Sequence, residues 1–177
     1  GALARLRRVM SDIRSGVMST TVALTLMDFV GENVERAIIF LARQHDLMAI
    51  GAFGFGKNGR PLAESSRNFQ FPRDGDDALA QTAVDGQLRD MTWDDAVLPE
   101  NLRSALGAPR FDQVVVLPVM GTHRVLAVIY ADNGDIKAPV KDLELLEIAG
   151  AQVGTALENE LLRRQLTADR VQLPETV

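Results

Sequence analysis

The chain has 177 residues, 46% of them apolar and 24% charged, which is the composition of a folded globular domain and not of a disordered segment. Its formal net charge is −5, so a general nucleic-acid-binding surface is not expected. The absence of cysteine excludes disulfides, thiol catalysis and thiolate metal sites, and the two histidines lie far apart, at positions 45 and 123.

No apolar run reaches the roughly 20 residues that a membrane-spanning helix needs, and no signal peptide opens the chain. We therefore expect a cytoplasmic protein without a membrane partner. Because the sequence begins with Gly1 and not with Met, we also expect it to be part of a longer protein.

A helix is predicted over residues 1–18. Its apolar residues recur at alternating spacings of three and four, with arginines around them, which is a heptad pattern. Such a helix either packs on its own domain or pairs with a second chain, and we favour pairing because the apolar stripe is narrow. The stripe consists of Leu3, Leu6, Met10, Ile13 and Val17.

Residues 19–166 are expected to form the main domain. The first half of this domain is predicted to contain a helix followed by a hairpin. Ser19 is a good N-cap for the helix and Gly31 can end it. Two apolar runs, at 37–41 and 47–55, predict strands in the middle of a sheet, because a strand that is apolar on both faces must be covered on both.

Short elements are predicted after this hairpin. Residues 62–75 are polar and irregular, with a short strand around 69–71. Two short helices follow, at 78–84, where Gly86 is a stop signal, and at 99–106.

The last part of the chain predicts two strands, at 114–119 and 124–130, and then a long helix over residues 139–166. This helix has two apolar stripes and is therefore expected to be packed on two sides. Its two interior glycines each cost about 1 kcal/mol relative to alanine, which close approach to a neighbouring element would explain. We assign one stripe, Leu146, Gly150, Val153 and Leu157, to a dimer interface, and we expect residues 167–177 to form a flexible tail.

The sequence shows no catalytic constellation. No phosphate-binding loop is present, and neither histidine has the neighbours of a catalytic triad. Residues 74–100 hold eight acidic residues and one basic residue, which we interpret as a solvated face, with docking to a basic partner as the alternative. We therefore assign no catalytic residue, no metal ligand and no cofactor-binding residue, and the cofactor remains unknown.

The aromatic residues are concentrated in one part of the chain. Core packing explains most clusters of this kind, but these residues lie in or beside loops that cover one face of a sheet, so they are also candidates for lining a ligand cavity. Two arginines, each close to an aromatic residue in the sequence, would supply the polar contacts of this cavity. The candidate pocket consists of Phe53, Phe55, Phe69, Phe71, Arg73, Trp93 and Arg110.

Three consecutive motifs carry a resemblance to a known family. They are a strand with Leu117-Pro118-Val119, a strand ending in Tyr130-Ala131-Asp132, and a helix with Asp142-Leu143-Glu144-Leu145-Leu146 near its start. In this order they resemble the C-terminal half of GAF domains, and the resemblance extends over about residues 19–162. It implies an α+β fold with a central antiparallel sheet of five to six strands, flanked by helices, with long N- and C-terminal helices.

The resemblance implies a sensory module of a multidomain bacterial signalling protein. Proteins of this kind include those that carry receiver domains, such as response regulators. The module would be non-catalytic, form a homodimer through its terminal helices, act on neighbouring domains of its parent chain and take a small-molecule ligand. The alternatives are a ligand-free dimerisation or docking scaffold and, less favoured, an enzyme acting on a small molecule. Cysteine-dependent properties of the family cannot carry over to a chain without cysteine.

Overall fold

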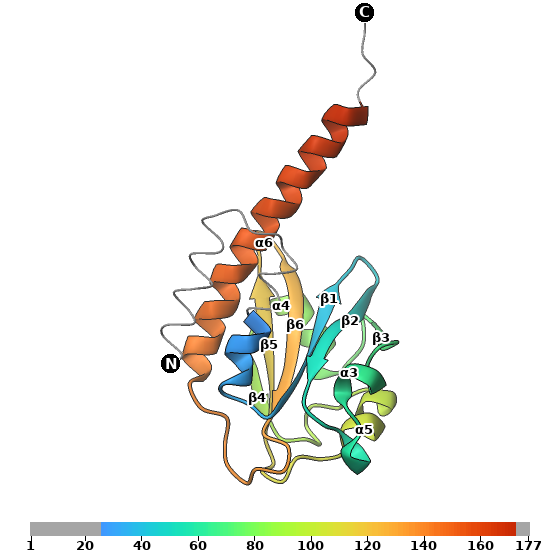
Figure 1. The fold of residues 1–177 in the computed structure, drawn as a ribbon, viewed down its shortest axis with the longest axis vertical. Coiled ribbons are helices and arrows are strands. Elements are labelled where there is room, and N and C mark those ends of the chain that lie inside the picture. Colours follow the sequence, from blue (N-terminus) through green and yellow to red (C-terminus); the bar gives the residue numbers. More distant parts are fainter. Residues whose placement is uncertain (1–25, 173–177) are drawn as a thin grey trace, which may run out of the picture.

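The structure is a computed structural model that describes residues 26–172 (Figure 1). The helix predicted over residues 1–18, with its stripe Leu3, Leu6, Met10, Ile13 and Val17, lies outside this range, as do Ser19 and the last five residues of the predicted tail. No helix in the described range is long and apolar enough to cross a membrane.

One six-stranded antiparallel sheet forms the centre of the fold, with the strand order β3-β2-β1-β6-β5-β4. This confirms the predicted α+β class, and the two predicted hairpins supply its four central strands. The strands are β1 (Arg36–Ala42), β2 (Asp46–Phe53), β3 (Gln70–Pro72), β4 (Arg89–Met91), β5 (Val114–Met120) and β6 (Val125–Asp132).

Helices cover both faces of the sheet. Residues 26–31, which are helical, and α6 cover one face, called the α6 face below. The short helices cover the opposite face, called the α4 face. The helices are η1 (Lys57–Gly59), α3 (Leu62–Ser65), α4 (Ala78–Asp85), α5 (Glu100–Leu106) and α6 (Leu143–Gln172).

Strand alternation divides the apolar residues between two cores. In β1, Ile38 and Phe40 belong to the α4 face and Ile39 belongs to the α6 face, where it lies opposite Ile129 of β6. All eight residues of β6 are buried, which is why its sequence is almost continuously apolar.

The capping residues of α4 explain why the sequence predicted it well. The Asp77 side chain accepts a hydrogen bond from the Ala80 amide at 3.1 Å, and Gly86 ends the helix in a left-handed conformation with φ of 67°. Sequence patterns missed α3 and β4, which span four and three residues and carry no clear periodicity.

The long helix differs from its prediction at both ends. It begins at Leu143 and not at residue 139, because Asp142 has a φ of 57°, which a right-handed helix does not allow. It continues to Gln172, so residues 167–172 of the predicted tail are helical.

The stripe assigned to a dimer interface packs inside the domain, which corrects that prediction. Leu146 and Val153 are buried in the core of the α6 face, and Leu157 packs against it. A methyl group on Gly150 would lie 2.7 Å from the carbonyl oxygen of Pro118, so this glycine lets the helix approach β5 closely. A partner chain therefore has no access to Leu146, Gly150 and Val153 while α6 lies on the sheet.

Candidate functional site

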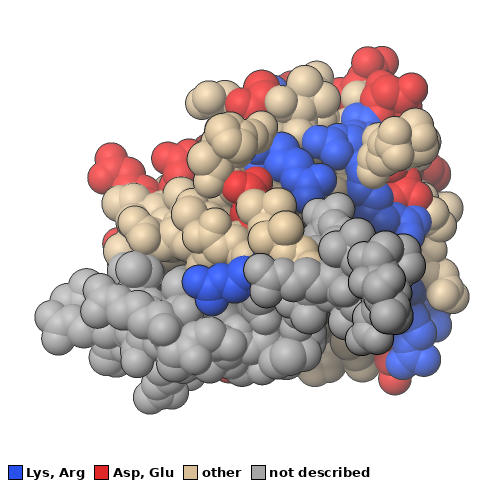
Figure 2. Space-filling view, turned by 90° about the horizontal axis from the view of Figure 1, so that it is seen from above, with Lys and Arg blue, Asp and Glu red and all other residues tan. Residues whose placement is uncertain are grey.

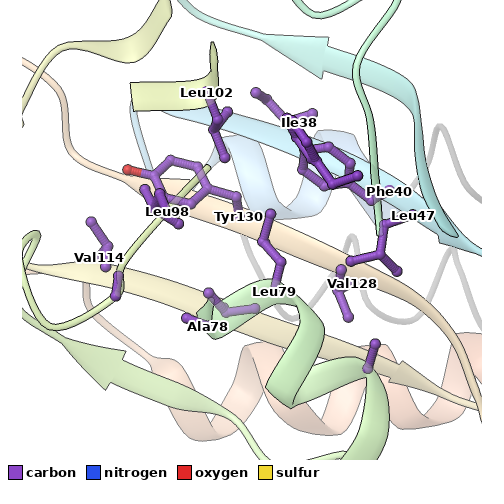
Figure 3. Close-up of a cluster of buried hydrophobic side chains, with 14 of the residues drawn as sticks. Ile38, Phe40, Leu47, Ala78, Leu79, Leu98, Leu102, Val114, Val128 and Tyr130 are labelled. Atoms are coloured by element: carbon purple, nitrogen blue, oxygen red, sulfur yellow. The ribbon is translucent and has the colours of Figure 1, made fainter. Parts of the chain in front are cut away.

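The α4 face is filled by apolar side chains from the sheet and from three helices. Figure 3 shows Leu79 of α4 and Leu102 of α5 pointing toward Tyr130 and Val128 of β6. Each of these side chains is completely buried. This face therefore has the packing of a protein core.

A polar cluster, which we call the Arg36 cluster, lies beside this apolar core. The Arg36 guanidinium donates to both carboxylate oxygens of Asp132, at 2.6 and 3.0 Å, and Asp132 also accepts a hydrogen bond from the Tyr130 hydroxyl. The same guanidinium donates to the carbonyls of Leu106 and Gly107, both at 2.6 Å. The cluster thus ties β1 and β6 to the C-terminal end of α5.

The Arg36 cluster is closed to solvent and internally satisfied. The side chains of Arg36 and Asp132 are 6% and 0% exposed. Burial, together with the Asp132 carboxylate, raises the pKa of Tyr130 well above its usual value, so the phenol stays protonated. In residues 26–172, every described buried side-chain nitrogen or oxygen has a hydrogen-bond partner.

Three of the seven candidate pocket residues border the core of the α4 face, but Phe69 and Phe71 lie by β3 and Trp93 follows β4, at opposite edges of the sheet. The rings of Phe69 and Phe71 are 5.5 Å apart, and Phe71 is 5.8 Å from Phe40. Trp93 packs on the edge of the same core, with the Arg103 guanidinium 5.7 Å from its ring centre.

The other four candidates lie elsewhere. Phe53 packs against the core of the α6 face, Phe55 is 66% exposed, and Arg110 is also exposed. The Arg73 guanidinium donates to the carbonyls of Arg43 and Ala83. The structure therefore does not gather the seven into one site, and a ligand pocket at this place stays a prediction.

The acidic segment, residues 74–100, includes the buried residues of α4, but its carboxylates lie at the surface except for that of Asp77. Asp77 caps α4, and burial raises the pKa of its carboxyl group. Arg89 pairs with Asp85 at 2.7 Å and lowers the pKa of Asp85 to about 2. Figure 2 views the end of the molecule where α6 leaves the sheet, and there the acidic side chains lie around the rim while basic ones gather in a band.

Neither histidine lies in a metal-binding constellation. His45 and His123 are exposed in turns, and the described part of the chain contains no group of three histidine, aspartate or glutamate side chains placed to hold a metal ion.

A second stripe on α6, which we call the α6 seam, is mostly exposed, although its first residue, Leu145, packs against the core of the α6 face. Its members recur at alternating spacings of three and four, and all but the partly buried first one are exposed. The spacing is visible in the sequence, but three polar residues lie in the middle of the stripe and interrupt its apolar character. The seam consists of Leu145, Ile148, Gln152, Thr155, Asn159, Leu162 and Leu166.

Comparison with known proteins identifies relatives in structure and in family. The GAF domain family matches residues 4–157. No match is found among curated protein sequences.

Solved structures share the fold at low sequence identity. The phycocyanobilin-bound GAF domain from a cyanobacterial phytochrome has a TM-score of 0.67 and 16% identity, over 92% of this chain and 97% of that one. A methyl-accepting chemotaxis protein, residues 122 to 287, has a TM-score of 0.64 and 18% identity, over 90% and 98%. The reduced form of fRMsr of Staphylococcus aureus has a TM-score of 0.59 and 11% identity, over 89% and 95%.

Proposed function

This chain belongs to the GAF domain family, and we propose that it is a non-catalytic regulatory module of bacterial signal transduction that forms a homodimer through the α6 seam. In this proposal α6 carries the state of the domain to neighbouring domains of the parent protein. Structural relatives from a chemotaxis protein and a phytochrome support a signalling role.

The exposed α6 seam is the observation that carries the proposal. Ile148, Leu162 and Leu166 are 53%, 52% and 62% exposed, although they lie on one line along a single helix. A helix of the same kind from a second copy would cover all three, since heptad spacing keeps the seam facing its partner.

The polar middle of the seam favours one alignment of the two helices. Gln152, Thr155 and Asn159 separate its two apolar ends. A single asparagine at a core position of a coiled coil fixes register at a cost in stability, because its amide is satisfied only by the matching residue. We therefore expect two parallel helices in register and a reversible dimer.

The test measures molar mass by light scattering over a range of concentrations, for the natural chain and for Leu162→Glu. A charge in the seam should prevent the dimer, because it would be buried without a partner. Val84→Glu is the matched control, since Val84 is an apolar residue of α4 that is 74% exposed and lies outside the seam. A natural chain that stays monomeric at high concentration, or a dimer that Leu162→Glu leaves intact, contradicts the proposal.

A ligand-free scaffold is the second candidate, because apolar side chains fill the α4 face and its described buried side-chain polar atoms all have hydrogen-bond partners. Native mass spectrometry of the purified chain separates the two candidates. A retained small molecule supports the sensory module, whereas a ligand-free dimer supports the scaffold. An enzyme is less favoured, because the chain has no cysteine and its described residues include no group of histidine, aspartate and glutamate side chains placed to hold a metal ion.

A further inference from the structure

We infer that the turn between β5 and β6 couples α4 to α6, so that a shift of α4 on one face of the sheet moves the output helix on the other. This inference rests on the proposed function only in treating α6 as the output helix. The coupling itself lies within one copy of the chain.

Met120, the last residue of β5, touches both helices. Its side chain belongs to the α4 face and meets the end of α4, where a methyl group on Gly86 would lie 2.7 Å from the Met120 sulfur. Its backbone meets α6, where a methyl group on Gly154 would overlap the Met120 carbonyl oxygen. Met120 therefore contacts α4 on one face of the sheet and α6 on the other.

The turn that follows Met120 makes a second contact with α6. The Glu158 carboxylate accepts a hydrogen bond from the Thr122 amide at 2.7 Å, and it lies against Gly121. The Thr122 hydrogen bonds, with the nearby charge of Arg124, lower the pKa of Glu158. Glu158 is the most C-terminal residue of α6 that is buried, among those whose side chains are described.

These contacts are close enough to transmit displacement. Gly154 and Gly121 leave no space for even one methyl group, and close-packed groups of this kind move together or lose contact. The register also shifts between Val119 and Met120, so Met120 lies at an irregularity of the β5–β6 ladder. Thr155 and Asn159 of the α6 seam flank the two contacts directly in sequence, so a shift there reaches the dimer interface.

Hydrogen exchange on the full chain tests the coupling. Met120→Ala removes the contact with α4 and leaves the backbone against Gly154, so the inference expects the amides of residues 151–158 to exchange about tenfold faster, although the substituted side chain lies on the opposite face. Met91→Ala is the matched control, because Met91 is the same residue type, packs partly buried against the same core and lies outside the turn. Met120→Leu should restore slow exchange.

The reciprocal experiment perturbs the other side. Glu158→Gln weakens the hydrogen bond between α6 and the Thr122 amide and changes no residue of the α4 face. Coupling between two sites must act in both directions. Glu158→Gln should therefore speed exchange in α4, residues 78–85. Glutamine has nearly the size of glutamate and its amide oxygen can still accept a hydrogen bond, so this variant keeps the test decisive if Met120→Ala does not fold.

Two results would overturn the inference: equal effects of Met120→Ala and Met91→Ala on α6, or a Glu158→Gln variant with unchanged exchange in α4. Repeating the comparison in the Leu162→Glu background separates the inference from the proposed function. Coupling within one copy must persist there, even if the dimer is lost or never forms.

Discussion

Arg36 forms a buried ion pair in the described fold. It is 5% exposed, pairs with Asp132, and donates to two backbone carbonyls at the end of α5. A buried ion pair adds little over a well-packed apolar pair, but removal of one partner leaves a buried charge uncompensated. The Arg36 cluster therefore stabilises the fold because each buried polar group in it has a hydrogen-bond partner within the cluster.

Arg36→Met should lower the free energy of unfolding by about 3–5 kcal/mol, measured by urea denaturation, because Asp132 stays buried without its cation. Arg43→Met is the control, since the Arg43–Asp46 pair lies at the surface with side chains 43% and 20% exposed. Its loss should cost about 1 kcal/mol or less. Equal costs for the two variants would show that burial does not set the value of the Arg36 pair.

Tyr130 is the only tyrosine of the chain, so ultraviolet absorbance follows its ionisation alone. Its pKa is raised in the folded state, so the stability it contributes is complete below the unfolded value of about 10 and is lost as pH rises above it. We expect no phenolate signal at 295 nm while circular dichroism reports a folded chain. Phenolate in the folded chain near pH 10 would contradict this, and Tyr130→Phe should lose less stability with rising pH.

At the scale of elements, the packing of α6 on β5 depends on glycine. Gly154→Ala would raise helix stability by about 1 kcal/mol at an exposed position. Here the methyl group overlaps the Met120 carbonyl, so we expect the opposite sign, a loss of about 1–3 kcal/mol in thermal or urea unfolding. Thr155→Ala, at the exposed neighbouring position, is the control and should be neutral or stabilising. A stabilised Gly154→Ala variant would refute this close approach.

Apolar runs predicted all four central strands, including β2, which is only partly buried. The strands at β1, β5 and β6 were visible because they are buried on both faces, and α4 was visible through its caps. Periodicity also predicted two apolar stripes on α6, but it could not tell which stripe meets the sheet. That choice depends on how closely two backbones approach, and hence on Gly150 and Gly154 in three dimensions.

The candidate pocket shows the same limit. Phe53 and Phe71 are near one another in sequence, yet they lie on opposite faces of the sheet. The Arg36 cluster, in contrast, joins residues separated by up to 96 positions, so no local pattern could reveal it. Only its members' unusual setting, an arginine and an aspartate at the ends of apolar strands, was visible in the sequence.

At the scale of the molecule, the two apolar cores share one sheet. Adjacent residues of β1, β5 and β6 contribute to opposite cores, so neither core can lose its strands without the other losing them too. The described domain should therefore unfold as one cooperative unit.

Two leucine substitutions test this cooperativity from opposite faces. Leu79→Ala empties part of the α4 core and Leu146→Ala part of the α6 core; both side chains are buried, and each change should cost about 2–5 kcal/mol. Trp93, the only tryptophan, reports the α4 face by fluorescence, while circular dichroism is weighted toward α6, the longest described helix. In each variant the two probes should give one midpoint, because the shared strands transmit the loss to both faces. If the two probes gave separate midpoints, and each variant shifted only the probe on its own face, the two faces would unfold independently. The turn at Met120 would then have no rigid sheet through which to couple α4 to α6.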